Sequence, residues 1–216
     1  LEDGISSFGI DFLLTDCYRD QNAASCAKLT RNPDYSLALA IDTVDNVSER
    51  GATGIDTEVR WDFESGIGMW EVALLWSHTL EQTLVELPGQ DERNLEGLHF
   101  ENVTTANGGT YAEDKINTTV QWANANFSVS YLAEFISGIE APTVFFGDDY
   151  MQDIDSFLYH DLTANYVWQG LTVTAGVTNI TDEEPPWIDS AFNAKTDVST
   201  YRLFGRGYFL RLQYGF

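Results

Sequence analysis

Arg206-Gly-Tyr-Phe-Leu-Arg-Leu-Gln-Tyr-Gly-Phe216 closes the chain, and its alternation of residue types decides the fold class. Side chains of a β-strand point alternately to opposite faces, so a period of two indicates a strand with two unlike surroundings. One face is apolar and aromatic, and consists of Tyr208, Leu210, Leu212, Tyr214 and Phe216. The other face carries a cation, an amide and two glycines. A core strand of a soluble sandwich would alternate in the same way, but soluble chains usually end on frayed, polar residues.

Six earlier segments repeat the alternation and predict six further strands. In the first of them, apolar or uncharged side chains from Ile55 to Phe63 alternate with charged side chains from Asp56 to Asp62. The seven predicted strands are residues 55–63, 70–76, 116–122, 127–135, 158–168, 171–177 and 206–216. The chain is therefore expected to be an all-β protein with an antiparallel sheet.

Short and long connections alternate between these strands. The short connections are Ser65–Gly68, Ala123–Asn126 and Gln169–Gly170, and such links predict hairpins. The long connections are residues 81–112, 138–153 and 179–200, so all of them fall at one end of the sheet. Aromatic residues gather beside the short turns, and these are Trp61, Phe63, Trp70, Trp122, Phe127, Tyr166 and Trp168. A row of aromatic side chains at one level of a sheet is typical of a membrane interface.

The first 48 residues follow a different pattern. Ile5, Phe8 and Phe12 have helical spacing, which predicts a short amphipathic helix within residues 4–15. Residues 16–33 are polar and are expected to form a loop, and residues 37–41 a short strand. Cys17 and Cys26 lie in the polar stretch, where they would form a disulfide in an oxidising compartment or remain two unrelated thiols.

The composition excludes several classes of function. The 216 residues carry a formal net charge of −23, which disfavours nucleic acid as a partner because phosphates are bound by clustered Lys and Arg. An aromatic content of 13% is too high for a disordered chain. Nucleophile, zinc-protease, phosphate-loop and dinucleotide motifs are absent from the sequence, so no catalytic residue, metal ligand or cofactor is expected. The isolated histidines His78, His99 and His160 are expected to be structural or exposed.

The last two predicted strands carry a specific resemblance. Residues 175–186 end a strand with the phrase Asn-Ile-Thr-Asp-Glu-Glu-Pro-Pro, and Gly205-Arg206 precedes a strand that ends in Phe216. This arrangement resembles the C-terminal end of the β-barrel of TonB-dependent outer-membrane receptors. Gly54-Ile-Asp-Thr-Glu58 is similar to a phrase found in the middle of these barrels, and the cysteine pair after a short helix is similar to an external loop of some members.

The resemblance implies a segment of an antiparallel transmembrane β-barrel with long extracellular loops, comprising about seven or eight strands of a 22-stranded barrel. Residues 1–48 would form an external loop with a short helix and the cysteine pair, and residues 49–216 seven barrel strands. A plug domain and a TonB box are absent from the sequence, so residues 1–216 are expected to be the C-terminal portion of a receptor. Two unpaired barrel edges predict that this portion does not fold by itself.

The implied function is active transport across the outer membrane of a Gram-negative bacterium. The receptor would bind a scarce nutrient (a siderophore–iron complex, a vitamin or a saccharide) and import it with energy from the TonB complex, which acts through the missing plug. Its other partner would be outer-membrane lipid. In such receptors the external loops hold the ligand, and the aromatic candidates in these loops are Tyr111, Phe145, Tyr150, Trp187 and Phe192. These side chains would stack on a sugar or aromatic siderophore, or pack loop against loop.

Charged residues on the inward faces are the second group of candidates. They are Asp56, Glu58, Arg60, Asp62, Glu71, Glu134 and Arg211, and they are expected to be solvated or paired with plug residues. Two other functions remain open. One is a secreted, disulfide-bearing β-sandwich that binds carbohydrate, and the other is an outer-membrane barrel enzyme built around His78 or His160.

Overall fold

The computed structural model describes residues 4–85, 91–102, 107–142, 150–191 and 194–215. The described secondary structure is mostly β-strand, and nearly all strand pairs with a defined register are antiparallel, which confirms the all-β expectation. The chain divides into two compact units. The helical unit comprises Leu1–Ala52, Glu81–Leu95 and Glu101–Gly108, and the sheet unit comprises Thr53–Leu80, Glu96–Phe100 and Gly109–Phe216.

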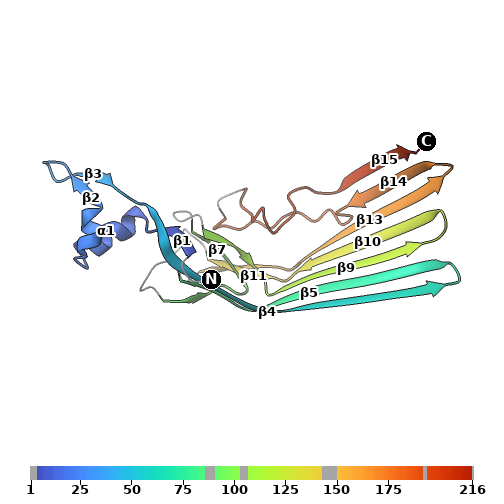
Figure 1. Ribbon diagram of the computed structural model, residues 1–216, viewed down its shortest axis with the longest axis horizontal. Coiled ribbons are helices and arrows are strands. Elements are labelled where there is room, and N and C mark those ends of the chain that lie inside the picture. The colour runs from blue at the N-terminus through green and yellow to red at the C-terminus, as the bar shows by residue number, and fades with distance from the viewer. Residues whose placement is uncertain (1–3, 86–90, 103–106, 143–149, 192–193, 216) are drawn as a thin grey trace. The chain divides into compact units, whose positions relative to one another are not determined.

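Seven strands form the sheet of the sheet unit in the order β4-β5-β9-β10-β13-β14-β15 (Figure 1). Their bounds are β4 Val44–Ser65, β5 Gly68–Val85, β9 Asp114–Ala123, β10 Phe127–Ile136, β13 Phe157–Trp168, β14 Leu171–Thr178 and β15 Gly207–Tyr214. The short links β4–β5, β9–β10 and β13–β14 all lie at the same end of this sheet. The seven predicted strands and the alternation of short and long connections are therefore confirmed.

The two-residue link between β13 and β14 shows why a tight turn forms there. Gln169 and Gly170 both have positive φ angles, 46° and 83°. This conformation matches the right-handed twist of a hairpin, and glycine adopts it without a steric penalty. Gly215, which directly follows β15, donates its backbone N–H to the carbonyl of Gly170 at 3.0 Å. The turn therefore fixes the register of β13 and β14 and also contacts the end of β15.

The strand registers align the apolar residues into one continuous face. Across the sheet the aligned pairs are Trp70↔Trp122, Val72↔Val120, Val120↔Tyr131, Tyr131↔Leu162, Leu162↔Val177, Val173↔Leu212 and Ala175↔Leu210. This apolar face is not a buried core in the described part of the chain, since Trp61 is 63% exposed, Leu210 67% and Leu212 65%. The described residues therefore leave this apolar face without the apolar neighbour that would stabilise it.

Aromatic rings form a row on this face beside the short links. Trp61 lies 4.8 Å from Phe63, and Phe63 stacks on Trp70 with centroids 6.0 Å apart. Trp70 then contacts Trp122 at 6.3 Å, and Trp122 contacts Phe127 at 5.8 Å. The aromatic row, which we define as these five residues, spans four neighbouring strands. The predicted clustering of aromatic residues near the short turns is confirmed.

The opposite face of the sheet is polar. Glu58 and Arg60 form an ion pair of 2.6 Å along β4. Asn165 on β13 donates to Ser128 on β10 and accepts from Thr174 on β14, so one amide joins three strands. In the described residues, β15 and the part of β4 between residues 53 and 65 each have a hydrogen-bonded neighbour strand on one side only. The sheet is therefore open at both edges.

Shorter strands occupy two of the predicted long connections. Residues 81–112 contain the end of β5, β6 (Arg93–Asn94), β7 (Leu98–Asn102) and β8 (Asn107–Tyr111), and residues 138–153 contain β11 (Ile139–Pro142) and most of β12 (Met151–Ile154). Four of these form a small sheet in the order β12-β11-β7-β8. The expectation of irregular loops is wrong here, because alternate residues such as Ile139 and Ala141 are buried and so stabilise strands too short to show a clear period.

The helical unit corrects the prediction for the first residues. Gly4–Ser7 forms β1, which pairs with β4, and the helix α1 spans Ile10–Tyr18. Residues 16–33 are not a loop, because they include the end of α1, the helix α2 (Ala23–Ala27) and the strand β2 (Leu29–Arg31). The side chain of Asn22 accepts the backbone N–H of Ala24 at 3.0 Å and so caps α2, a signal hidden in the polar composition.

A disulfide joins the two helices of this unit. Cys17 on α1 and Cys26 on α2 are bonded, so the predicted pair is confirmed and the alternative of two unrelated thiols is wrong. The predicted strand at residues 37–41 is also present, as β3 (Leu37–Ala40) paired with β2. Among the described helices, none has the length and apolar character that crossing a membrane requires.

Candidate functional site

A folded loop lies at the long-connection end of the sheet unit, and we name its described residues, 179–191 and 194–206, the rim loop. Ile188, Ala191 and Tyr201 of this loop are almost fully buried. They belong to one hydrophobic cluster together with Ala112, Ile136, Ile139, Ala141, Ile154, Phe157 and Tyr159. The rim loop therefore packs into a hydrophobic core that it shares with β10, β11, β12 and β13, although its described residues contain no regular helix or strand.

Arg202 ties the rim loop to the polar face of the sheet. Its guanidinium donates to both carboxylate oxygens of Asp161 at 2.8 and 3.0 Å, and to Glu134 at 2.7 Å. The ring of Tyr159 lies 5.0 Å from the guanidinium carbon. Burial alone would lower the pKa of Arg202, but the hydrogen bonds to the two carboxylates raise it, so the side chain remains a cation. Glu134 was expected to be solvated or paired with a plug, and the structure pairs it with Arg202.

The Asn-Ile-Thr-Asp phrase that begins the rim loop has a structural role. Asn179 is 1% exposed and has a positive φ of 51°, a conformation that asparagine tolerates better than most residues. Its side-chain amide donates to the carbonyl of Glu183 and accepts the N–H of Glu183. Asp182 then accepts the backbone N–H of Arg206 at 2.6 Å. These side chains bring the two ends of the rim loop together.

Asp197 organises the middle of the rim loop. Its carboxylate accepts the backbone N–H of Thr110 at 2.8 Å, the N–H and hydroxyl of Ser199 at 2.9 and 2.6 Å, and the hydroxyl of Thr200 at 3.0 Å. Burial would raise the pKa of Asp197, but these hydrogen bonds stabilise the anion and lower the pKa to about 2. Burial, together with the negative charge of Asp197, raises the pKa of Tyr201. The carboxylate is therefore ionised at neutral pH.

Two of the predicted ligand-binding residues, Tyr150 and Trp187, lie on neighbouring segments at the long-connection end of the sheet unit. Tyr150 is 57% exposed and Trp187 is 64% exposed. Gln152 joins their segments, because its amide donates to the carbonyl of Trp187 at 2.7 Å and accepts the N–H of Asp189 at 3.0 Å. A groove of about 360 Å³ lies beside Trp187 and is also lined by Asp182, Glu184, Pro185, Pro186 and Lys195. An exposed tryptophan beside charged side chains suits a sugar or an aromatic ligand.

The other predicted ligand-binding residues are not brought to this groove by the described structure. Tyr111 is half-buried at the end of β8, and its carbonyl accepts the N–H of Gly97. Phe145 and Phe192 lie outside the described residues. Of the predicted ligand-binding residues that the structure describes, Trp187 lines the groove, whereas Tyr150 and Tyr111 are not part of its lining. Tyr150 lies two residues before Gln152, which joins its segment to that of Trp187.

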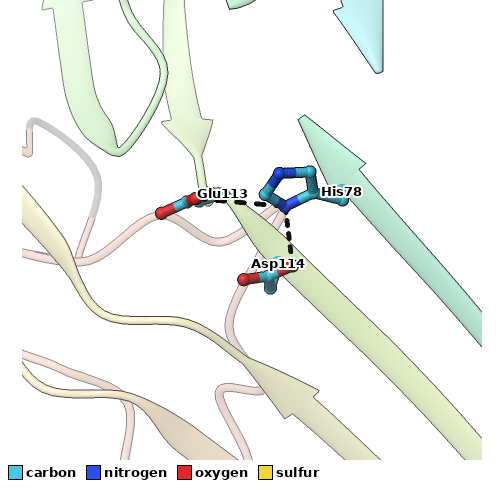
Figure 2. Close-up of side chains that lie close together, drawn as sticks. All are labelled: His78, Glu113 and Asp114. Atoms are coloured by element: carbon cyan, nitrogen blue, oxygen red, sulfur yellow. Dashed lines mark hydrogen bonds and ion pairs between the residues drawn. The ribbon is translucent and has the colours of Figure 1, made fainter. Parts of the chain in front are cut away.

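A second cluster lies where β5 meets the start of β9 (Figure 2). The Nδ1 atom of His78 lies 2.9 Å from Asp114 Oδ1 and 3.9 Å from Glu113 Oε1. Trp76 donates its indole N–H to the same Asp114 oxygen at 2.7 Å. The sequence alone did not predict this cluster, because more than 30 residues separate His78 from Asp114. The strand register would have predicted it, since the register places the two residues opposite each other.

His160 has a different environment. It interrupts the apolar face of β13, and its Nδ1 atom lies 2.5 Å from the hydroxyl of Tyr131 on β10. The two rings stack with centroids 5.8 Å apart. This pairing satisfies a polar group on an apolar surface, which is the structural role expected for it.

Comparison with known proteins identifies no relative. The chain matches no protein-family model, no curated protein and no solved structure. The geometry of the sheet, the rim loop and the two side-chain clusters is therefore the basis for assigning its function.

Proposed function

We propose that the chain forms part of the β-barrel wall of a TonB-dependent outer-membrane receptor, which binds a scarce nutrient and imports it across the outer membrane of a Gram-negative bacterium. The observation that carries this proposal is the apolar face. It extends over six register-aligned strands and is exposed within the sheet, as at Leu162 and Tyr166 on β13, and at its edge, as at Leu210 on β15. Soluble proteins seldom expose an apolar surface of this extent.

Lipid is the neighbour that this face fits best. β9 and β10 have 10 residues each and β13 has 12, and a tilted membrane strand needs about 9–11 residues to cross the hydrocarbon layer. The aromatic row lies at one end of these strands, where amphipathic rings prefer the membrane interface. At the other end, Trp76 directs its indole N–H to Asp114. Aromatic residues thus flank the apolar band at both ends.

The polar face would line the interior of the barrel. It carries the Glu58–Arg60 ion pair and the Arg202 network, groups that need water or partners rather than lipid. Barrel closure requires further strands at the two open edges of the sheet, β15 and β4, because an unpaired edge exposes backbone hydrogen-bonding groups. These strands, together with the plug that contacts the TonB complex, would come from the rest of the receptor.

The rim loop and its neighbours would form part of the ligand-binding surface. Trp187 and Tyr150 would stack on the ligand, while Asp182, Glu184 and Lys195 beside the groove would bind its polar groups. A siderophore–iron complex, a vitamin and a saccharide all combine planar or ring-shaped surfaces with polar groups. The surface therefore suits this class of nutrient without selecting among its members.

The first experiment compares the complete chain in buffer and in detergent micelles. We expect it to aggregate in buffer and to gain the far-UV circular dichroism signal of β-sheet only in micelles, because micelles cover the apolar face and buffer does not. Sedimentation in each medium measures the state of association. A monodisperse, cooperatively melting chain in plain buffer would contradict the membrane proposal.

A secreted carbohydrate-binding module is the second candidate function, and the exposed Trp187 beside a groove favours it. In that case a second layer of protein would have to cover the apolar face. If the chain is monodisperse in buffer, titration with a panel of glycans while tryptophan fluorescence is recorded becomes the deciding measurement. A Trp187→Ala variant should then lose the response, and a Trp61→Ala variant should keep it.

A further inference from the structure

We propose that His78, Glu113 and Asp114 bind a divalent transition-metal ion, with Zn²⁺ as the ion that fits this set of ligands. The site lies outside the rim loop and its groove. It is also independent of the proposed nutrient transport, because the ion would join two segments of the sheet unit rather than serve as cargo. The proposal rests on the distances, on the way the three residues are held, and on the chemistry of their donor atoms.

The ligand atoms are close enough to share one ion. His78 Nδ1 lies 2.9 Å from Asp114 Oδ1 and 3.9 Å from Glu113 Oε1, and one ligand atom from each residue falls within a span of 4.8 Å (Figure 2). Zinc binds imidazole nitrogen and carboxylate oxygen at about 2.0–2.2 Å, so neighbouring ligands around one ion are separated by roughly 3–3.5 Å. Small movements of the Glu113 side chain would complete this geometry.

The backbone holds the three residues in place on both sides. His78 and Asp114 are directly opposite in the β5–β9 register. The N–H of Thr79 donates to the carbonyl of Glu113 at 2.8 Å, while Asp114 accepts at its carbonyl from Ser137 N–H and donates its own N–H to Ser137 Oγ. A site whose ligands are fixed before the ion arrives loses less entropy on binding.

A supporting contact orients the aspartate. The indole N–H of Trp76 donates to Asp114 Oδ1 at 2.7 Å, and the rings of Trp76 and His78 are 5.6 Å apart. Hydrogen bonds of this kind to a ligating carboxylate are a regular feature of metal sites and tune their affinity. Asp114 Oδ2 remains a second oxygen of the same carboxylate, so one residue can bind the ion and keep the bond to Trp76.

The donor set favours a particular class of ion. One imidazole and two carboxylates suit Zn²⁺ better than Ca²⁺ or Mg²⁺, which prefer a shell of oxygen atoms. An imidazole binds a metal ion through a ring nitrogen that carries no proton, so the ion would replace the hydrogen bond between His78 Nδ1 and Asp114 Oδ1, and the ring proton would lie on Nε2. The side chains of His78, Asp114 and Glu113 are 21%, 30% and 51% exposed, so the ion can enter and keep water at its remaining positions.

The test is calorimetric titration of Zn²⁺ into the complete chain, in the medium where circular dichroism shows the β-sheet. A millimolar excess of Mg²⁺ is present throughout, because a chain with a net charge of −23 attracts cations nonspecifically. His78→Gln and Glu113→Gln remove one ligand each at almost constant shape. The matched controls are Glu140→Gln, an exposed carboxylate on β11, and His160→Gln, the histidine paired with Tyr131.

We expect one site per chain, with affinity lowered about tenfold or more by His78→Gln and by Glu113→Gln and unchanged in both controls. Visible absorption of bound Co²⁺, which reports nitrogen and oxygen ligands, should fall in the same two variants. Equal affinity in all variants, or no binding above the Mg²⁺ background, would overturn the site. Because Glu113 is half-exposed, its variant should retain the β-sheet signal even if His78→Gln does not. Neither result bears on membrane insertion, which the comparison of buffer and micelles measures separately.

Discussion

At the residue scale, a few individual polar side chains stabilise the conformation of the rim loop. Asn179, Asp182 and Asp197 each satisfy several backbone groups, and Arg202 joins the loop to Glu134 and Asp161. A loop without regular helix or strand has no internal hydrogen-bond pattern of its own, so these side chains supply it. The loop is thus an ordered surface on which Trp187 can be presented to a ligand.

Asp197 should make the rim loop sensitive to acid. Its pKa is lowered from 3.8 to about 2, so the carboxylate stabilises the folded loop above about pH 4 and loses this contribution as the pH falls towards 2. The lost contribution is about 2 kcal/mol. We expect pepsin to cleave the loop of the native chain increasingly below about pH 4. Asp197→Asn should be cleaved over the whole acid range, and the exposed Glu184→Gln should follow the native profile.

Arg202 should be the main anchor of the same loop. Arg202→Ala would leave two carboxylates without their cation and should lower the free energy of unfolding by about 2 kcal/mol, a value reduced because the side chain is 28% exposed. Arg202→Lys should recover only part of this, because an ammonium cannot form the paired bonds to Asp161. Guanidinium unfolding in micelles measures the loss.

The control for this anchor is Arg206→Ala, which removes an exposed cation of the same loop and leaves the backbone bond to Asp182 in place. Adding Glu134→Gln to Arg202→Ala should restore part of the lost stability, since one unpaired charge is removed. If Arg202→Ala and Arg206→Ala were equally mild, the network would be an accessory contact and not an anchor.

The residues of these networks show what sequence alone can predict of the site. The polar character of one face of the sheet follows from alternation, and Glu134 was placed on that face correctly. Its partner could not be predicted, because Arg202 lies 68 residues away in a loop without periodicity. The contact between His78 and Asp114 was missed for the same reason, although His78 itself was named as a candidate. Alternation predicts which face of the sheet a residue occupies. It does not predict which residue of the neighbouring strand lies opposite, because that depends on the strand register.

At the scale of elements, the sequence predicted long strands well and short strands poorly. Seven long strands with a period of two were placed correctly, since each repeats its signal over several residues. The strands β7, β8, β11 and β12 were missed because 4 or 5 residues give too few repeats, and packing against neighbours supplies their stability instead. The helix was placed too early, because Ile5 continues the helical spacing but belongs to β1.

The two helices of the helical unit depend on their disulfide. Helices of 9 and 5 residues are too short to be stable alone, and the Cys17–Cys26 bond restricts the unfolded chain between them. We expect the double substitution Cys17→Ser and Cys26→Ser to destabilise this segment by roughly 2–3 kcal/mol, while the sheet keeps its stability. Hydrogen exchange followed by mass spectrometry separates the two regions.

The outcome should be faster exchange in residues 10–27 and unchanged exchange in β9 and β10. The substitution Ser7→Ala, in β1 and without effect on the disulfide, serves as the comparison. Equal loss of protection in the helices and in the sheet would show that the helical segment is not a separate cooperative element.

At the scale of the whole molecule, the two faces of the sheet must meet different surroundings. Leu210 and Gln213 lie on the same strand, β15, and both are exposed, but they belong to opposite faces. If lipid covers the apolar face, a cation at position 210 must enter the hydrocarbon layer, whereas a cation at 213 joins the polar interior. The same chemical change should therefore be costly at position 210 and mild at position 213.

We expect Leu210→Arg to cost about 2–4 kcal/mol of folding into phospholipid vesicles and Gln213→Arg to cost less than about 1 kcal/mol. The measurement is guanidinium unfolding of the vesicle-bound chain followed by tryptophan fluorescence, with flotation to determine the bound fraction. Leu210 is suited to this comparison because it lies in the middle of β15, opposite Ala175, far from the polar ends of the strand. Equal costs for the two variants would mean that lipid does not distinguish the faces. The apolar face would then have to be covered by protein, and the carbohydrate-binding sandwich would replace the receptor as the better account of the chain.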